Sequence, residues 1–170
     1  MQVPFGEWLP DLPDHANPGA TEAKNVFPAA NSYRPFQNIT ATSSNALTAR
    51  CQGGKAFKSD SGVVSIFAGD ATKLYKLTTN AFVDESGGTT FSFSGDYHWD
   101  FIRFGEVVIA FNGDDAAQAW TLDSSSDFAA LGGSPPVFRH AAVVGNFVVT
   151  GFQPTAQNKV QWSAVNSATS

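Results

Sequence analysis

The chain has 170 residues, 42% of them hydrophobic, and a formal net charge of −5 at pH 7. Its 15 Phe, 4 Trp and 3 Tyr supply enough apolar surface for a packed core, which excludes an intrinsically disordered polypeptide. The acidic balance argues against tight wrapping around nucleic acid, the single Cys51 allows no internal disulfide, and no apolar run is long enough to span a membrane as a helix.

Residues 1–50 are predicted to form an extended N-terminal arm. Prolines recur every few residues from Pro4 to Pro35, and each fixes φ and removes a backbone donor, so neither a long helix nor a central strand can form there. One short helical turn is predicted at 21–26. The arm still carries large apolar side chains, so we expect it to pack against the β domain or an adjacent subunit. The candidate subunit-interface residues are Trp8, Leu9, Phe27, Tyr33, Arg34 and Phe36.

Residues 51–170 are predicted to form an all-β domain. Closely spaced turn residues and the absence of helical periodicity after residue 30 favour strands, and the alternation over 89–94 is typical of a half-buried one. Gly62 and Gly145 are expected at tight hairpins, where Gly145 takes a positive φ. The predicted strands are 55–57, 63–68, 74–77 and 90–93 in one part of the domain, and 99–104, 107–111 and 119–122 in the next.

These strands recur with a period of about 44 residues, because residues 63–70 (VVSIFAGD) return as residues 107–114 (VVIAFNGD). Phe57 matches Phe101 on the same spacing, and a partial third copy starts at Phe138. A repeat of this length built from short strands is typical of a β-propeller blade. Two full copies and a partial third are fewer than a closed propeller needs, so the domain is expected to be an open assembly completed by other subunits or a shortened version of a longer protein. Tyr75, Trp120 and Trp162 fall at the same repeat position and are predicted to be buried on matching strands.

Several sequence segments, taken together, form a pattern that can be compared with known protein families. They are 8–13 (WLPDLP), 17–26 (NPGATEAKNV) and 33–36 (YRPF) in the arm, and 67–75 (FAGDATKLY), 99–101 with Phe104-Gly105, and 160–164 (VQWSA) in the domain. In these the chain resembles the tail nozzle (tail tubular B-like) and tail-hub proteins of tailed bacteriophages. The resemblance implies a structural protein with a β-propeller that assembles as a ring around the DNA channel of a virion tail. Family members are several times longer, which implies either a truncated gene, as in a decayed prophage, or a minimal homologue.

The acidic side chains are interpreted as structural. A strand over 96–100 would place Asp96, His98 and Asp100 on one face, as a metal site requires, but the other copies offer no matching ligands, so a solvated strand face is the better interpretation. Asp70 and Asp114-Asp115 follow glycines without the distal Glu of a calcium loop, so we expect turns closed by the side chain.

Signals of catalysis are weak. Cys51 has no nearby His and is predicted to be a buried structural residue, and the chain contains neither a nucleophile elbow nor a phosphate loop. No catalytic residue, cofactor or metal is therefore expected. The first residues lack the basic start and apolar stretch of a signal peptide, so Sec-dependent export is not expected either.

Two functions remain open from the sequence. The first is a non-enzymatic subunit of a phage tail or head–tail assembly, made in the bacterial cytoplasm and located in the virion. Its expected partners are further copies of itself in a ring, neighbouring tail or portal and adaptor proteins, and phage DNA in passive contact with a channel, but no membrane. The alternative is a small carbohydrate-binding module or enzyme. Aligned exposed aromatics would favour the alternative, and buried aromatics at the repeat positions would favour the structural subunit.

Overall fold

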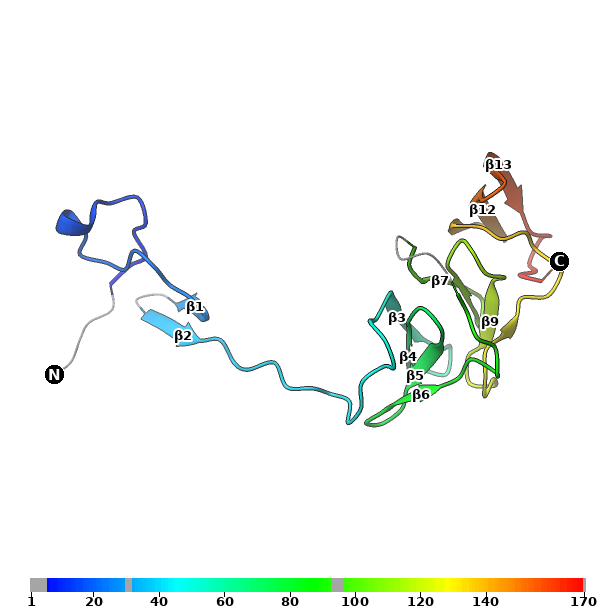
Figure 1. The fold of residues 1–170 in the computed structure, drawn as a ribbon, viewed down its shortest axis with the longest axis horizontal. Helices are drawn as coiled ribbons and strands as arrows, with labels where there is room; N and C mark the ends of the chain where they lie inside the picture. The colour runs from blue at the N-terminus through cyan, green and yellow to red at the C-terminus, as the bar shows by residue number, and fades with distance from the viewer. Residues whose placement is uncertain (1–5, 30–31, 93–96, 170) are drawn as a thin grey trace. The chain divides into compact units, whose positions relative to one another are not determined.

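The computed structural model describes residues 6–29, 32–92 and 97–169, and its regular structure is almost entirely β (Figure 1). Apart from the 3-10 helix η1 (Asp14–Ala16), the described elements are strands in antiparallel sheets, which confirms the predicted all-β class. The contacts divide the chain into two compact units, here called the arm unit (Met1–Ala41) and the β unit (Thr42–Ser170). Residues 42–50, which the sequence assigned to the arm, lie with the β unit.

The arm unit is built around a short hairpin. Strands β1 (Val26–Ala29) and β2 (Ser32–Pro35) pair antiparallel, and Phe36 extends the pairing by donating its N–H to the carbonyl of Asn25 at 2.8 Å. The helical turn predicted over 21–26 is wrong, because Asn25 has a φ of 55° and Val26 already belongs to β1. The hairpin accommodates two prolines because a two-stranded sheet has only edge strands.

The first sheet of the β unit has the order β3-β4-β5-β6. Its strands are β3 (Gly54–Lys58), β4 (Val64–Gly69), β5 (Leu74–Leu77) and β6 (Phe82–Asp84), so three of the predicted strands are confirmed. The fourth was predicted at 90–93, but residues 90–92 form no strand, and Phe93 lies outside the described residues. The N–H of Thr78 donates to the carbonyl of Ala81 at 2.8 Å, and this tight turn brings β6 onto β5 instead.

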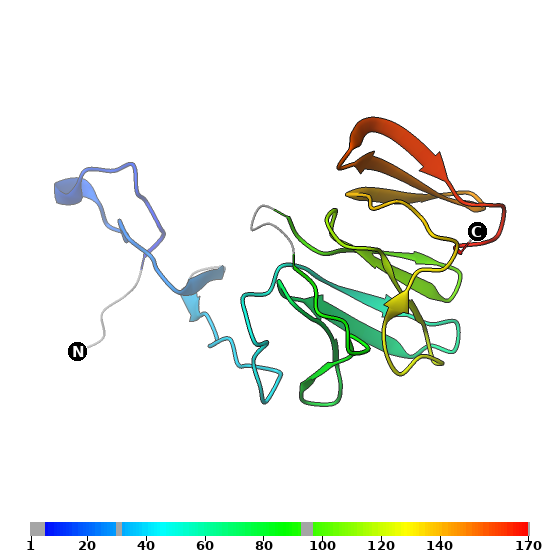
Figure 2. The same ribbon diagram turned by 45° about the vertical axis from the view of Figure 1, so that its right-hand side comes forward.

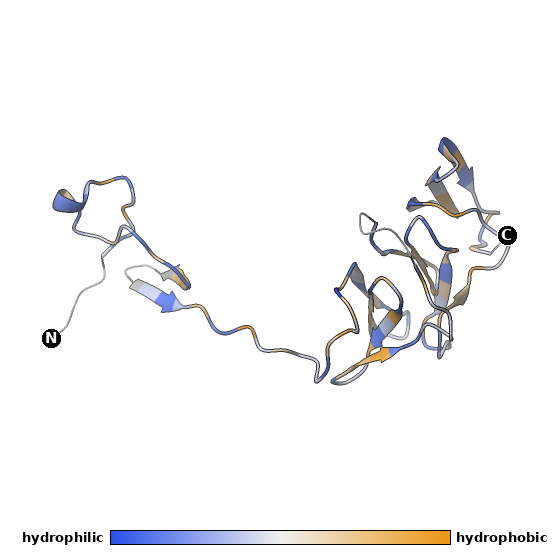
Figure 3. Ribbon diagram, in the orientation of Figure 1, coloured by the Kyte–Doolittle hydropathy of each residue, from blue (hydrophilic) through white to orange (hydrophobic). Residues whose placement is uncertain are grey.

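Two further sheets follow in the chain. The second sheet contains β7 (Asp100–Phe104), β8 (Val107–Phe111), β9 (Gln118–Thr121) and β10 (Ala129–Ala130), and the third contains β11 (His140–Val144), β12 (Phe147–Gln153) and β13 (Ala156–Trp162). Every paired neighbour is antiparallel. The predicted positive φ is confirmed at Gly145, where a two-residue turn joins β11 to β12. Figure 3 shows that both hydrophobic and hydrophilic residues occur in the strands of the β unit.

The three sheets of the β unit lie side by side in chain order (Figure 2). We call the side of a sheet that points toward the next sheet its forward face, and the opposite side its rear face. One core cluster joins Phe57, Phe67 and Leu74 on the forward face of the first sheet to Phe101, Val108, Ala110 and Trp120 on the rear face of the second. Another joins Ile109 and Phe111 on the forward face of the second sheet to Val148 on the rear face of the third.

The hydrogen-bond registers correct the repeat alignment. Trp120 lies opposite Val108 on a rear face, as predicted for a buried position, whereas Trp162 lies opposite Val149 on a forward face. Trp162 is 70% exposed, and Ala119, not Trp120, is its counterpart in the second sheet. The alignment at Trp162 is therefore wrong by one residue, and a one-residue shift in a strand moves a side chain to the other face.

The predicted equivalence of Phe57 and Phe101 in the repeat is also wrong, because the two residues lie on opposite faces of their sheets. Phe57 lies opposite Ser65 on the forward face of the first sheet, and Phe101 lies opposite Ala110 on the rear face of the second. The two rings contribute to one core cluster from opposite sides. The hairpin loop between β3 and β4 spans residues 59–63, whereas only residues 105–106 join β7 to β8, so a constant sequence spacing cannot keep both strand pairs in register.

Residues 42–50 run along the first sheet and cover the end of its last strand. The side-chain amide of Asn45 donates to the carbonyl of Phe82 at 2.8 Å and accepts the N–H of Phe82 at 2.8 Å. The N–H of Ser44 donates to the carbonyl of Asn80 at 2.6 Å. One side chain thus pairs with β6 as a neighbouring strand would.

Candidate functional site

The hairpin of the arm unit carries an exposed aromatic face. Phe27 lies opposite Arg34, and the ring of Phe36 is 5.0 Å from that of Phe27 between centroids. Phe27 and Phe36 are 53% and 47% exposed, and Arg34 is also exposed. We call this set the Phe27–Phe36 patch. Aromatic rings beside a guanidinium are the residue types that dominate binding energy in protein interfaces.

The opposite side of the hairpin forms a small hollow. Trp8, Ala23, Val26 and Tyr33 line a cavity of about 190 Å³ within the arm unit. Trp8 is 59% exposed and donates its indole N–H to the carbonyl of Thr21 at 3.4 Å. The structure therefore brings Trp8 together with Tyr33, and Phe27 together with Arg34 and Phe36, on two different sides of the hairpin.

Leu9 has a more internal role than the other candidates. Its backbone N–H donates to the carbonyl of Ala20 at 3.0 Å, and its own carbonyl accepts the side-chain amide of Asn17 at 2.7 Å. Asn17 in turn accepts the N–H of Gly19 at 2.8 Å. Leu9 thus helps to close the loop that carries Trp8, and its contacts are within the arm unit.

The β unit contains a polar site that sequence reasoning described only in part. Asp70 is fully buried between β4 and β5. One carboxylate oxygen accepts the N–H groups of Thr72 and Lys73, each at 2.9 Å, which confirms the predicted side-chain turn. The other accepts the hydroxyls of Thr48 and Tyr75, each at 2.9 Å, and the N–H of Ala49 at 3.1 Å.

The second sheet repeats this turn with a different residue. Asn112 accepts the N–H groups of Asp114 and Asp115 at 3.0 and 2.8 Å and is also buried. The structural counterpart of Asp70 is therefore Asn112, two residues before the Asp114 that the sequence alignment indicated. The same kind of turn thus recurs in the second sheet, and the hydrogen-bond donors to Asp70 belong to the chain itself. Both observations support a structural role for Asp70.

Burial would raise the pKa of Asp70, but hydrogen bonds from Thr72, Thr48 and Tyr75 outweigh it and lower the pKa from 3.8 to about 2. Burial also raises the pKa of Tyr75, so its hydroxyl stays protonated as a donor near neutral pH. Asp70 is not among the residues that line the hollow between the third sheet and the segment before it.

The lowered pKa of Asp70 predicts a specific dependence of stability on acid. Because the pKa is lower in the folded state than in the unfolded state, ionised Asp70 stabilises the fold fully above about pH 4, and this stabilisation is lost as the pH falls toward about 2. Denaturant melts of the wild type and of Asp70→Asn over this range should show a steeper loss for the wild type. Parallel curves would contradict the hydrogen-bond assignment.

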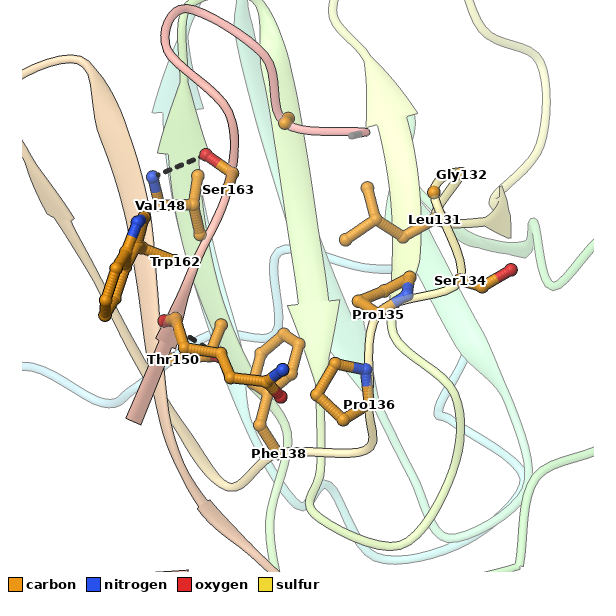
Figure 4. A pocket seen from close by; sticks show the side chains of 13 residues that line it. Leu131, Gly132, Ser134, Pro135, Pro136, Phe138, Val148, Thr150, Trp162 and Ser163 are labelled. Carbon is orange, nitrogen blue, oxygen red and sulfur yellow. Dashed lines mark hydrogen bonds between the residues drawn. The ribbon is translucent and has the colours of Figure 1, made fainter. Parts of the chain in front are cut away.

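A hollow of about 190 Å³ lies where the third sheet meets the segment before it. Phe138, Leu131, Pro135 and Pro136 line one side, and Figure 4 shows them facing Val148 and Thr150 across the opening. The residues that line it offer hydroxyl, amide and apolar groups but no carboxylate, imidazole or amine. The indole of Trp162 stands apart from Phe138 and the prolines in the same view.

The remaining chemical candidates stay separate. Cys51, predicted to be buried, is exposed, because the strand β3 begins only at Gly54 and leaves it in a loop. Asp96 lies outside the described residues, His98 is exposed, and Asp100 begins β7. Across residues 6–29, 32–92 and 97–169, no three His, Cys, Asp or Glu side chains gather as a metal ion would require.

Searches for similarity gave no match, either to a protein-family model or to a curated protein sequence. In the part of the chain that the structure describes, no helix has the length and hydrophobicity to cross a bilayer.

Proposed function

We propose that this chain is a structural, non-enzymatic subunit of a bacteriophage tail or head–tail assembly, in which it packs with other copies into a ring. The observation that carries the proposal is the Phe27–Phe36 patch, which places two large apolar rings and a guanidinium on the surface of the small arm unit. Such a patch is costly in water and is typical of a surface that another protein covers.

The β unit fits the same role. Its sheets follow one another in chain order and pack face to face, as the blades of a β-propeller do, and we propose that they are blades of an incomplete propeller. The segments that resemble tail nozzle and tail-hub proteins lie in both units, which supports one joint role for arm and sheets. In the virion, the net charge of −5 would favour passive contact with DNA over tight binding.

The alternative function, a carbohydrate-binding module, has one specific observation in its favour. Trp162 is exposed on a sheet face, and an exposed aromatic ring can stack on a sugar. However, Tyr75 and Trp120 are buried at 4% and 1% exposure, so no row of exposed aromatics forms at the predicted positions. The hollow on the forward face that Trp162 lines is otherwise formed by Val144, Phe147 and Val149, without the polar groups that orient a sugar.

The arm can be tested directly. We expect Phe27→Ser together with Phe36→Ser to reduce the size of the assembly formed by the purified chain, because the substitutions remove both rings of the patch. Sedimentation velocity and electron microscopy of stained particles would measure the assembly. The matched control is Ile39→Ser, which removes an apolar side chain that is 89% exposed but lies outside the patch.

Deleting residues 1–41 should have the same effect on assembly while leaving the β unit folded, since the two units are separately compact. Its unfolding free energy should change by less than about 0.5 kcal/mol. Patch variants that assemble like the wild type would contradict the proposed role of the arm. Genes for portal, capsid or tail proteins beside this gene would support the virion role, and a metabolic operon would contradict it.

A further inference from the structure

The third sheet presents a forward face that is apolar and uncovered. Val144, Val160 and Trp162 are 58%, 57% and 70% exposed. Phe147 and Val149 are half-buried, and with Val144 and Trp162 they line a shallow hollow of about 250 Å³. This surface is the forward side of β11, β12 and β13, and no residue of the described core clusters lies on it.

This face repeats the buried forward face of the second sheet. The pair Phe104–Val107 closes one two-residue hairpin, and the pair Val144–Phe147 closes the equivalent one. Further along, the cross-strand pair Ile109–Ala119 corresponds to Val149–Trp162. In the second sheet these positions contribute to a core cluster, because the rear face of the third sheet covers them; they are Phe104, Val107, Ile109 and Ala119.

The first sheet is open on part of the opposite side. Ala68 and Tyr75 are buried on its rear face, where the Thr48 hydroxyl lies 2.7 Å from that of Tyr75. On its rear face Val64 is 59% exposed and Ile66 is 37% exposed. Leu77 and Phe82 are half-buried on the same face, where Leu77 lies opposite both Ile66 and Phe82. The equivalent rear faces of the second and third sheets are covered by the sheet that precedes each of them.

The β unit therefore carries one uncovered forward face and one partly uncovered rear face, and both of its internal sheet contacts join a forward face to a rear face. We propose that a second copy of this chain covers both. The forward face of the third sheet in each copy packs on the rear face of the first sheet in the other copy. Trp162, at the end of β13, is the largest exposed side chain of the forward face, and Ile66 lies within the inner strand β4 on the rear face.

The number of sheets in each chain favours an assembly of two copies. Three sheets from each of two copies make a ring of six, within the four to eight blades of closed propellers, whereas three copies would make nine. A closed pair related by a two-fold axis leaves neither face open, while a head-to-tail contact that does not close would form filaments. The inference rests on the propeller architecture proposed above and is independent of the virion role.

The experiment uses the full chain with the Phe27→Ser and Phe36→Ser substitutions, so that contacts through the arm do not contribute. Sedimentation equilibrium of this background protein should give twice the 18.0 kDa of one chain. The proposed pair contains the same interface twice. Adding Trp162→Glu, or separately Ile66→Glu, should therefore halve the mass, because either substitution places a charge in each of the two interfaces. Val165→Glu is the matched control, since Val165 is 58% exposed but lies outside the strands, and it should keep the doubled mass.

Mixing the two face variants decides the pairing. The Trp162→Glu copy keeps a native rear face and the Ile66→Glu copy keeps a native forward face, so an equimolar mixture should regain the doubled mass through one intact interface. This regain also shows that both variants are folded. A background protein that sediments as a single copy, a face variant that keeps the doubled mass, or a mixture that stays at single mass would each overturn the proposal. The failure of the arm proposal would appear separately, as equal assembly sizes for the wild type and the patch variant.

Discussion

Replacing Trp120 by alanine is expected to lower the free energy of unfolding of the β unit by about 3–5 kcal/mol. The indole is 1% exposed, and its ring lies 5.2 Å from those of Phe67 and Phe128 between centroids. The ammonium of Lys76 stands 4.7 Å from the ring centroid and adds a cation–π contact. The substitution would thus leave a cavity where the first and second sheets meet, and denaturant melting would measure its cost.

Trp162→Ala is the matched control, because it removes the same side chain from a face that the single chain leaves uncovered. Compared at a dilution at which the protein sediments as one copy, it should change stability by less than about 0.5 kcal/mol. Equal losses for the two variants would contradict the assignment of Trp120 to the core and of Trp162 to the surface.

Asp70→Ala is expected to cost about 3 kcal/mol, because it leaves several buried donors without an acceptor. The N–H groups of Thr72 and Lys73 and the hydroxyl of Thr48 all donate to this carboxylate. Loss of the carboxylate should loosen residues 42–50 from the first sheet, which hydrogen exchange at Ala49 would report.

The control for this variant is Asp60→Ala. The Asp60 side chain is 86% exposed and pairs with Arg103 at 2.7 Å, and a surface ion pair of this kind contributes at most about 1 kcal/mol. A loss at Asp70 no larger than the loss at Asp60 would mean that water or rearranged loops satisfy the donors.

The strands could be predicted where a short apolar segment lay between clear turns. Leu74–Leu77 and Val107–Phe111 have the predicted bounds because each has apolar residues between clear turns. The strand over 90–93 failed because Phe91 is buried by its position next to Trp99, at 4.9 Å between ring centroids, and not by sheet pairing. Burial of single residues produces the same alternation as a strand, and only tertiary contacts separate the two.

The register of the repeat could not be predicted from residue identity. Identical Gly-Asp dipeptides suggested that Asp70 matches Asp114, but the turn geometry matches Asp70 with Asn112. Asn and Asp close this turn equally well because both offer an acceptor oxygen two residues before the donor. The error at Trp162 had a larger consequence, since an odd shift exchanges the two faces of a sheet.

For the candidate site, composition suggested a set of interface residues, which stays a prediction, but not how they group. Phe27 and Phe36 face the same side because hairpin pairing places them there, and Tyr33 turns to the other side with Trp8. The network at Asp70 depends on Thr48, which lies 22 residues earlier in the sequence, a separation that no local pattern reveals.

The side chain of Asn45 has a consequence for misassembly. An uncovered outer strand offers free N–H and C=O groups to any extended peptide and can template the stacking of strands into fibrils. The amide of Asn45 occupies both groups of Phe82 on β6, a strand only three residues long. Asn45→Ala should therefore shorten the lag time of thioflavin-positive aggregation. With Asn45 in place, the protein can expose apolar faces for partner binding while one outer strand of its first sheet is protected against the addition of further strands.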